Sequence, residues 1–465
     1  MIWLYIILLI MSIYRYYSEY YSELSIESLS LTLLTVTIAV FAFFLRKEPY
    51  KSLRNNYLKI STLFVIGYII VHFFEYLAFI LGISEQIVDV DLIDSHYVNS
   101  AALCSLCSFL AFIIGYIKTN KGFDFGTHLK IGSKKNLLEY CIFFSTVLFY
   151  ISTDSSYFKG GYGELMNQSG GMSVTSFLSQ IFVEAFQVAC SIIVIYQKEK
   201  GCSWIKYVKS YSLIYYISLG VYMYLVLSSG DRGPLFHVAI CYIVTYFIIN
   251  KRKLSLYKTV LCLILAVCFL SFLGIMREMD GDLSVSKIEA ANDDRNVRMK
   301  GENAIFANTS ELSKVVRAYH VLYYYTNENS IIYGLGFVNQ LLGIIPGLRF
   351  VLYPILGIDI ESSSTFVTTL MDSDHGMGTT CVADTYFNLG FWGCIIAFFL
   401  WGCFVRKMDI SSYDITQKTS PFVLCVILCY FSYVITIGRA TFFAPIGIIA
   451  YSYLFLVLNS FMVKK

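Results

Sequence analysis

Apolar segments about as long as a bilayer is thick recur along almost the whole chain, and they restrict its fold more than any other feature. They lie near residues 1–15, 28–45, 60–82, 97–117, 137–152, 173–197, 211–227, 235–249, 258–275, 380–405, 421–437 and 442–462. Roughly 20 apolar residues cross a bilayer as a helix. Hydrophobic residues make up 57% of the chain and charged residues 14%, which excludes an ordinary soluble globule. The sequence predicts an all-α polytopic membrane protein with about 12 transmembrane helices.

Basic residues gather in alternate connections between these segments. They cluster near residues 46–59, 118–135, 198–209, 251–258 and 406–418 and at the C-terminus. The opposite short connections hold only Arg15, Lys159, Arg232 and Arg439. Lysine and arginine accumulate on the cytoplasmic side of membrane proteins, so both termini are predicted to be cytoplasmic. The N-terminal segment lacks a basic leader and a small-residue cleavage site, so we interpret it as the first span and not as a removed signal peptide.

One connection on the outer side is much longer than the others. Residues 276–378 form this loop, which separates nine predicted spans in 1–275 from three in 379–465. Within the loop, IIYGLGFVNQLLGIIPGLRFVLYPILG is apolar enough for a span, but glycines and prolines interrupt it. We expect a re-entrant or interfacial segment packed against protein, because irregular backbone at membrane depth must be covered.

Arginines mark the predicted outer connections. They are Arg232 in SSGDRGPLF, Arg277 in GIMREMDGD, Arg317 in SKVVRAYHVLYYY, Arg349 in IIPGLRF and Arg439 in TIGRATFF. A guanidinium binds two phosphate oxygens at once and tolerates partial desolvation, which favours an anion-binding role. The alternative is that each arginine pairs with a nearby carboxylate or extends to the membrane interface. Arg317 is predicted to lie on an amphipathic helix of the long loop, with His320 on the same helix.

A second group of polar residues lies in DSDHGMGTTCVADTYFNLGFWG, just before and inside the tenth predicted span. His375 is surrounded by acids and glycines. With Asp372 or Asp374 beside it, a neutral histidine is suited to accept a proton from a hydroxyl group. Asp384 is predicted about one turn inside the span, where an isolated carboxylate is costly. It could serve the same chemistry, or it could only pair with an arginine of another helix.

Other features indicate packing. Three ionisable residues inside predicted spans, His72, Glu75 and Glu184, are interpreted mainly as partners between helices. Most of the 13 cysteines lie inside apolar segments and are interpreted as small packing residues, not as a disulfide framework. We find neither a nucleotide-binding glycine loop nor metal-ligand spacing. No metal, cofactor or nucleic-acid partner is predicted.

Three motifs, in this order, resemble one family. SGDRGPL lies between two central spans, the long loop contains YGLGF and then IPGLR, and HGMGTTCVADTYFNLGFWG opens the next span. The chain thereby resembles the O-antigen or oligosaccharide repeat-unit polymerases of the Wzy type. Two positions depart from the pattern, because Asp231 stands where relatives often have serine and Asp384 where glutamate is common.

The resemblance implies a metal-independent glycosyltransferase of the membrane-embedded GT-C class in the bacterial inner membrane. The donor would be a glycan on undecaprenyl pyrophosphate, the acceptor a lipid-linked repeat unit, and the active site periplasmic. A Wzz-type chain-length regulator is an expected partner. In this reading His375 deprotonates the acceptor hydroxyl, with Asp384 as the second choice. The leaving pyrophosphate is neutralised by Arg232, Arg277, Arg317 and Arg439.

Two other functions are compatible with this sequence. An O-antigen ligase would use the same donor and a similar fold but would transfer the glycan to lipid A-core. A lipid-linked oligosaccharide flippase or other transporter would need cations along a path through both leaflets, whereas the arginines here are predicted on one side. A purely structural membrane protein would not explain the polar surroundings of His375 and Asp384.

Overall fold

A computed structural model of the chain describes residues 1–83, 87, 95–123, 135–155, 157–159, 173–198, 200–229, 233–262, 265, 315–345, 348, 351–353, 361–373, 376–413, 415 and 419–463. Across these ranges the chain forms helices joined by turns, with no strand. Six helices are long and apolar enough to cross a membrane: Ile26–Leu45, Ile60–Ile80, Ser95–Lys118, Val174–Gln197, Gly233–Asn250 and Cys381–Tyr413. The predicted all-α polytopic class is confirmed. The predicted number of spans is not tested, because most of the ninth, 258–275, lies outside the described residues.

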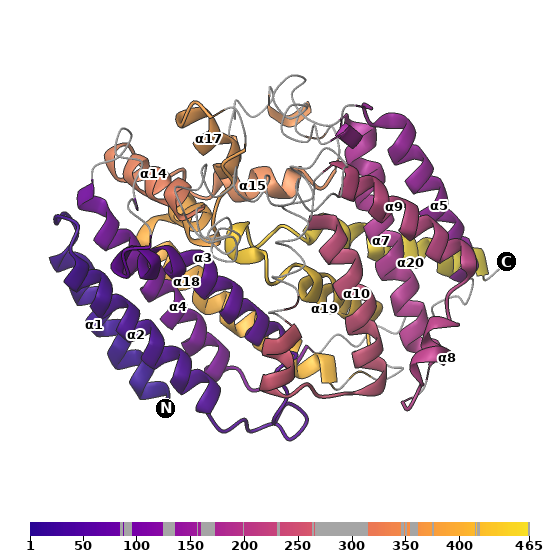
Figure 1. The fold of residues 1–465 in the computed structure, drawn as a ribbon, viewed down its shortest axis with the longest axis horizontal. Helices are drawn as coiled ribbons and strands as arrows, with labels where there is room; N and C mark the ends of the chain where they lie inside the picture. The colour runs from indigo at the N-terminus through magenta and orange to yellow at the C-terminus, as the bar shows by residue number, and fades with distance from the viewer. Residues whose placement is uncertain are drawn as a thin grey trace, which may run out of the picture.

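The helices pack as two groups that lie side by side (Figure 1). The first group contains α1 (Ile2–Ser18), α2 (Ile26–Leu45), α3 (Ile60–Ile80), α4 (Val98–Lys118) and α18 (Cys381–Tyr413). The second contains α5 (Lys135–Ser152), α7 (Val174–Gln197), α9 (Leu213–Ser229), α10 (Gly233–Asn250), α19 (Pro421–Tyr433) and α20 (Ile446–Val463). The groups meet where α18 contacts α19 and where α3 contacts the 3₁₀ helix η3 (Ile437–Arg439).

The centre of the first group is the crossing of α4 and α18. Helix α4 is apolar and small-residue-rich on all sides, and almost every residue from Val98 to Tyr116 is buried. A Cβ atom on Gly115 would lie 2.0 Å from the backbone oxygen of Phe399, and one on Gly402 would lie 2.0 Å from that of Phe112. Glycine therefore lets the two backbones touch, which is how helices in membranes gain close packing.

Three helices of the long connection cover one end of the bundle, the loop-bearing end. They are α14 (Val315–Glu328), α15 (Leu335–Leu342) and α17 (Ser363–Leu370), and all three contact α18 (Figure 1, top). Helix α14 also contacts α3 and α4. Two shorter 3₁₀ helices, η1 (Ser95–Tyr97) and η2 (Tyr157–Lys159), and the short α8 (Trp204–Val208) complete the described elements. Helix α15, which belongs to the apolar part of the loop, contacts α18.

The opposite end, the basic end, joins two of the lysine-rich connections. The backbone nitrogen of Tyr57 donates to the carbonyl of Leu254 at 2.8 Å, and Lys253 donates to the carbonyls of Lys51 and Arg54 at 2.9 and 3.0 Å. The alternation of basic connections predicted from the sequence therefore places these two on one face.

One basic residue at this end, Arg406, forms a buried ion pair. Arg406 is only 2% exposed and binds both carboxylate oxygens of Glu48, at 2.6 and 3.0 Å. It also donates to the Tyr116 hydroxyl at 3.1 Å, which in turn donates to Asp409 at 2.8 Å. Burial alone would raise the pKa of Glu48, but the hydrogen bonds and charge of Arg406 outweigh it and lower that pKa to about 2. Arg406 is thus a buried ion-pair partner.

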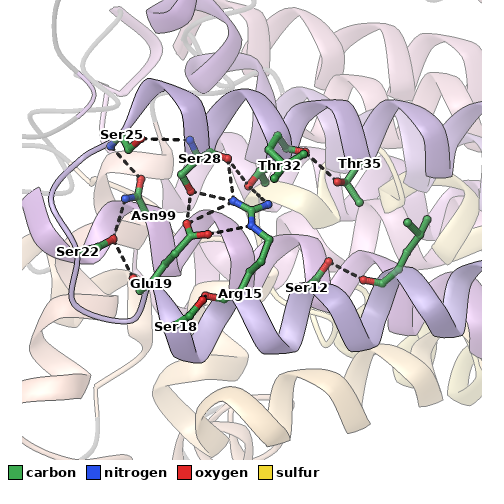
Figure 2. Close-up of polar contacts among 12 residues, drawn as sticks. Ser12, Arg15, Ser18, Glu19, Ser22, Ser25, Ser28, Thr32, Thr35 and Asn99 are labelled. Atoms are coloured by element: carbon green, nitrogen blue, oxygen red, sulfur yellow. Dashed lines mark hydrogen bonds and ion pairs between the residues drawn. The ribbon is translucent and has the colours of Figure 1, made fainter.

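A polar cluster fixes α1 against α2 near the loop-bearing end (Figure 2). Arg15 donates to Glu19 at 2.9 and 3.3 Å, to Ser28 at 3.0 and 3.1 Å and to Thr32 at 3.4 Å. Asn99, at the start of α4, donates to the Ser22 hydroxyl at 3.0 Å and so connects α4 to the turn between the two helices. Arg15 has a complete set of protein partners, which makes it a structural arginine.

Candidate functional site

Half of the predicted site residues can be placed in the structure. The described residues include Arg317, Asp384 and Arg439. Outside them lie Arg232, Arg277 and His375, together with Asp231, Asp374 and Arg349. Roles for this second set stay predictions from the sequence.

Arg439 lies on an interruption between two helices. Helix α19 has 13 residues, about 20 Å of helix, and is shorter than the ~30 Å hydrocarbon core. The sequence predicted a span as far as residue 437, but α19 ends at Tyr433 and turns lead into η3. The interruption packs against α3, because a Cβ on Gly438 would lie 3.2 Å from the Gly67 backbone oxygen and one on Gly67 would lie 2.4 Å from that of Ile435.

The guanidinium of Arg439 has no hydrogen-bond, ion-pair or ring partner in the part of the chain that the structure describes, and the residue is half-buried. This contrasts with Arg15 and Arg406, which have carboxylate partners. The interruption lies beside α15, because the ring of Phe443 contacts that of Phe337 with centroids 5.4 Å apart. A half-buried, unpaired cation beside α15 is suited to bind an anionic ligand.

Helix α3 brings the other elements together. The His72 Nε2 atom lies 3.8 Å from the Cys381 sulfur, at the first residue of α18. One turn further along α3, Glu75 Oε1 lies 3.5 Å from Arg317 Nη2 on α14. With Gly67 against η3, α3 contacts all three elements that carry described site residues. The predicted inter-helix roles of His72 and Glu75 are confirmed.

Arg317 lies on α14, as the amphipathic pattern predicts. Its side chain is 26% exposed, whereas that of Glu75 is 1% exposed. The structure therefore shows the carboxylate pairing that the sequence left open as an alternative. His320, on the same helix, is buried, and its Nε2 lies 2.8 Å from the Tyr76 hydroxyl of α3. Burial lowers the pKa of the His320 imidazole to about 3, so this histidine is neutral near pH 7.

Asp384 lies in the first turn of α18, as predicted, and is 2% exposed. Its carboxylate accepts hydrogen bonds from Gln340 at 3.0 and 3.1 Å and from the Ser363 hydroxyl at 2.7 Å. These partners come from α15 and α17, and neither is the arginine that the sequence offered as an alternative partner. Asp384 therefore ties two helices of the long connection to α18 through neutral donors.

The YGLG motif of the long connection docks on a break in α18. Gly390 has a φ of 68° and a ψ of −169°, which interrupts the helix. The carbonyls of Phe387 and Asn388 accept hydrogen bonds from Ile332 and Gly334 at 3.1 and 2.9 Å. A Cβ on Gly336 would lie 2.7 Å from the Asn388 side chain, so glycine is needed for this approach. The motifs YGLGF and NLGFWG are thus two halves of one contact.

Tyr323, in the tyrosine run of α14, has a structural role. The Tyr323 hydroxyl donates to that of Tyr16 at 2.8 Å, and its ring stacks on Tyr386 at a centroid distance of 4.3 Å. Tyr386 donates to Asn327 at 2.6 Å. Tyr323 is 1% exposed, so this ring cannot stack on a sugar. The ring is part of the contact between α14, α1 and α18.

Sequence reasoning missed one cluster in the second helix group. Glu184 of α7 accepts a hydrogen bond from the Tyr433 hydroxyl of α19 at 2.9 Å. His237 of α10 stacks on the Tyr433 ring at a centroid distance of 3.4 Å, with Nδ1 3.4 Å from the same carboxylate oxygen. His237 stands alone in an apolar segment, and its only sequence signal is its place directly after DRGPLF. The inter-helix role predicted for Glu184 is confirmed.

The described cysteines carry free thiols, most of them buried. Within the described ranges, no three His, Cys, Asp or Glu side chains converge as metal ligands would. Arg317, Arg439 and the buried Asp384 lie on three elements that each contact α3.

The fold and this site define a polytopic integral membrane protein with arginine-bearing elements at its loop-bearing end. The chain belongs to the O-antigen polysaccharide polymerase Wzy family, whose family model matches residues 1–465. Membership implies a glycosyltransferase-type reaction, and the resemblance noted in the sequence is confirmed. Neither a curated protein nor a solved structure was found to match the chain.

Proposed function

We propose that the chain polymerises undecaprenyl-pyrophosphate-linked oligosaccharide repeat units into O-antigen or a related surface polysaccharide. The observation that carries the proposal is the family match over the whole chain. The unpaired Arg439 supports a pyrophosphate-linked donor, because a group without a protein partner is free to bind an anion. The basic end faces the cytoplasm in this proposal, with both termini there, and the loop-bearing end faces the periplasm.

In the reaction, an acceptor hydroxyl oxygen attacks the anomeric carbon of the donor glycan. A new carbon–oxygen bond forms, the bond to the pyrophosphate oxygen breaks, and the electron pair leaves with the pyrophosphate. Negative charge grows on the leaving group in the transition state, where preorganised cations lower the barrier most. Arg439 supplies one cation, and Arg317 a second, whose charge is shared with Glu75. Arg232 and Arg277 complete the proposed set.

The acceptor proton passes to His375, oriented by Asp372 or Asp374, in a reaction that uses no metal ion. Asp384 is the second choice for this base. Its carboxylate already accepts hydrogen bonds from Gln340 and Ser363, which suits it better to holding α15 and α17 over the site. A chain-length regulator of the Wzz type is the expected protein partner.

Replacing Arg439 with lysine tests the donor site. The variant keeps the positive charge but loses the planar, two-point contact, so we expect turnover to fall on the order of 100-fold. The measurement uses purified protein in proteoliposomes with lipid-linked repeat units, and chain growth is followed on a gel. Arg232→Lys is expected to behave in the same way.

Arg252→Lys is the matched control, because Arg252 is exposed at the basic end, where its guanidinium lies 5.1 Å from the centroid of the Tyr246 ring. Its turnover should equal that of the wild type. Wild-type turnover in Arg439→Lys would refute the two-point contact. Absence of chain growth with the wild-type protein would refute the polymerase itself.

A further inference from the structure

Arg439 lies on a short stretch of backbone that must be held in place by its neighbours. The stretch 434–445 joins α19 to α20 and contains only the single 3₁₀ turn η3. Few of its hydrogen bonds are those of a regular helix, so its position depends on packing at its two flanks. One flank is the contact of Gly438 with Gly67 on α3.

The other flank is the cluster of Glu184, His237 and Tyr433. Tyr433 is the last residue of α19, and one short turn separates it from η3, of which Arg439 is the last residue. The Tyr433 hydroxyl donates to Glu184 of α7 at 2.9 Å, and its ring is covered by His237 of α10 at 3.4 Å. Two separate helices therefore fix the residue at which the interruption begins.

The polar groups of this cluster differ in how well they are hydrogen-bonded. Neither ring nitrogen of His237 has a hydrogen-bond partner among the described residues, although Nδ1 lies 3.4 Å from Glu184 Oε2. Its described contacts are thus the ring stack and the nearby carboxylate. Glu184 is 6% exposed, and a carboxylate at this depth is costly unless it is hydrogen-bonded or paired. What it holds is the end of α19.

We propose that Glu184, His237 and Tyr433 are positioning residues that set the place of Arg439 for the transfer reaction. This inference rests on the polymerase function proposed above. Arg439 is the group that binds the pyrophosphate, and the cluster acts only through it. A small displacement of a charged group that stabilises a transition state costs far more rate than substrate affinity. Loss of the cluster should therefore lower kcat and leave KM nearly unchanged.

The test is a double-mutant cycle between Tyr433→Phe and Arg439→Lys in the proteoliposome assay. Tyr433→Phe removes one hydroxyl and keeps the ring stacked on His237. In the wild-type background we expect kcat to fall about tenfold, with less than about a twofold change in KM. In the Arg439→Lys background the same change should alter kcat by less than about twofold, because the contact it positions is already lost.

Tyr196→Phe is the matched control. Tyr196 donates to the carbonyl of Thr419, just before α19 begins, so this variant loses a tyrosine hydroxyl bond at the other end of the same helix. It should have wild-type kcat. Glu184→Gln should retain more activity than Glu184→Leu, since the amide oxygen can still accept the hydrogen bond from the Tyr433 hydroxyl. Thermal unfolding of each variant shows whether a loss of kcat merely reflects an unstable protein.

The outcomes separate the two proposals. An equal loss of kcat from Tyr433→Phe in both backgrounds would overturn the positioning role, because the cluster would then act independently of Arg439. A KM effect without a kcat effect would overturn it as well. If Arg439→Lys were fully active, both the assigned role of Arg439 and the positioning role of the cluster would be wrong. If the wild-type protein joined no lipid-linked units, the polymerase function itself would be wrong.

Discussion

At the scale of single residues, three arginines of this chain differ in what surrounds them. Arg15 is held by Glu19 and by hydroxyl groups of α2 (Figure 2). Arg406 is buried against Glu48, whereas Arg439 has no partner among the described residues. The sequence shows all three at the ends of apolar segments and cannot separate them, because their partners lie on other helices. The structure therefore separates the arginines that already have carboxylate partners from Arg439, which remains a candidate for anion binding. The sequence pattern alone does not make this distinction.

His320 gives a pH dependence at this scale. Burial lowers its folded-state pKa from the ordinary 6.5 to about 3, so the unfolded chain binds a proton between these values and the folded protein does not. The contribution of the neutral His320 to the free energy of unfolding is fully present above about pH 6.5 and is lost as the pH falls towards 3. The slope approaches about 1.4 kcal/mol per pH unit. Thermal unfolding in detergent at several pH values between 7.5 and 4.5 measures it.

His320→Gln is the comparison for this measurement. Glutamine can still bond to the Tyr76 hydroxyl, but it takes up no proton, so its stability should change less with pH than that of the wild type. Identical pH slopes in the two proteins would show that the acid sensitivity comes from other groups. Tyr76→Phe should lower stability at all pH values alike, since it removes the hydrogen bond and no titrating group.

At the scale of helices, glycines decide where backbones touch and where helices break. Gly390 interrupts α18, and the freed carbonyls are bonded by the YGLG turn. The sequence contains both motifs and predicts that the loop segment packs on protein, but it does not show that the two motifs meet. The break requires a φ of 68° at Gly390, which hydropathy does not encode. Hydropathy likewise does not show that α19 ends at Tyr433, four residues before the predicted end of the eleventh span near 437.

The crossing of α4 and α18 can be tested by adding one methyl group. Alanine at Gly402 would place its Cβ 2.0 Å from the Phe112 backbone oxygen, so the helices must move apart. We expect Gly402→Ala to lower the free energy of unfolding by about 1–3 kcal/mol. Unfolding in a mild denaturing detergent, followed by loss of helical circular dichroism, measures the change.

Gly220→Ala is the matched control on α9. A Cβ there meets no atom within 4 Å, so the greater helix propensity of alanine should leave the protein unchanged or slightly more stable. Equal stability of Gly402→Ala and the wild type would mean that α4 and α18 do not touch as described. Equal losses in the two variants would mean that the effect comes from glycine's conformational freedom and not from contact.

At the scale of the whole molecule, the helical class and the alternation of basic connections followed from hydropathy and charge. The placement of the site followed only in part. The sequence pointed to Arg317, Asp384 and Arg439 as separate positions, and the structure shows that their elements pack around α3. The cluster at Tyr433 was not predicted, because its residues lie on three helices far apart in the chain.

Deleting the gene in its host and separating the surface lipopolysaccharide on a gel tests the polymerase function most directly. We expect the ladder of long chains to disappear while a band of core plus one repeat unit remains, with the ladder restored by the wild-type gene and not by Arg439→Lys. Long lipid-linked chains without any transferred O-antigen would instead indicate a ligase. Single units retained inside the cell would indicate a flippase. An unchanged ladder would contradict a polymerase function altogether.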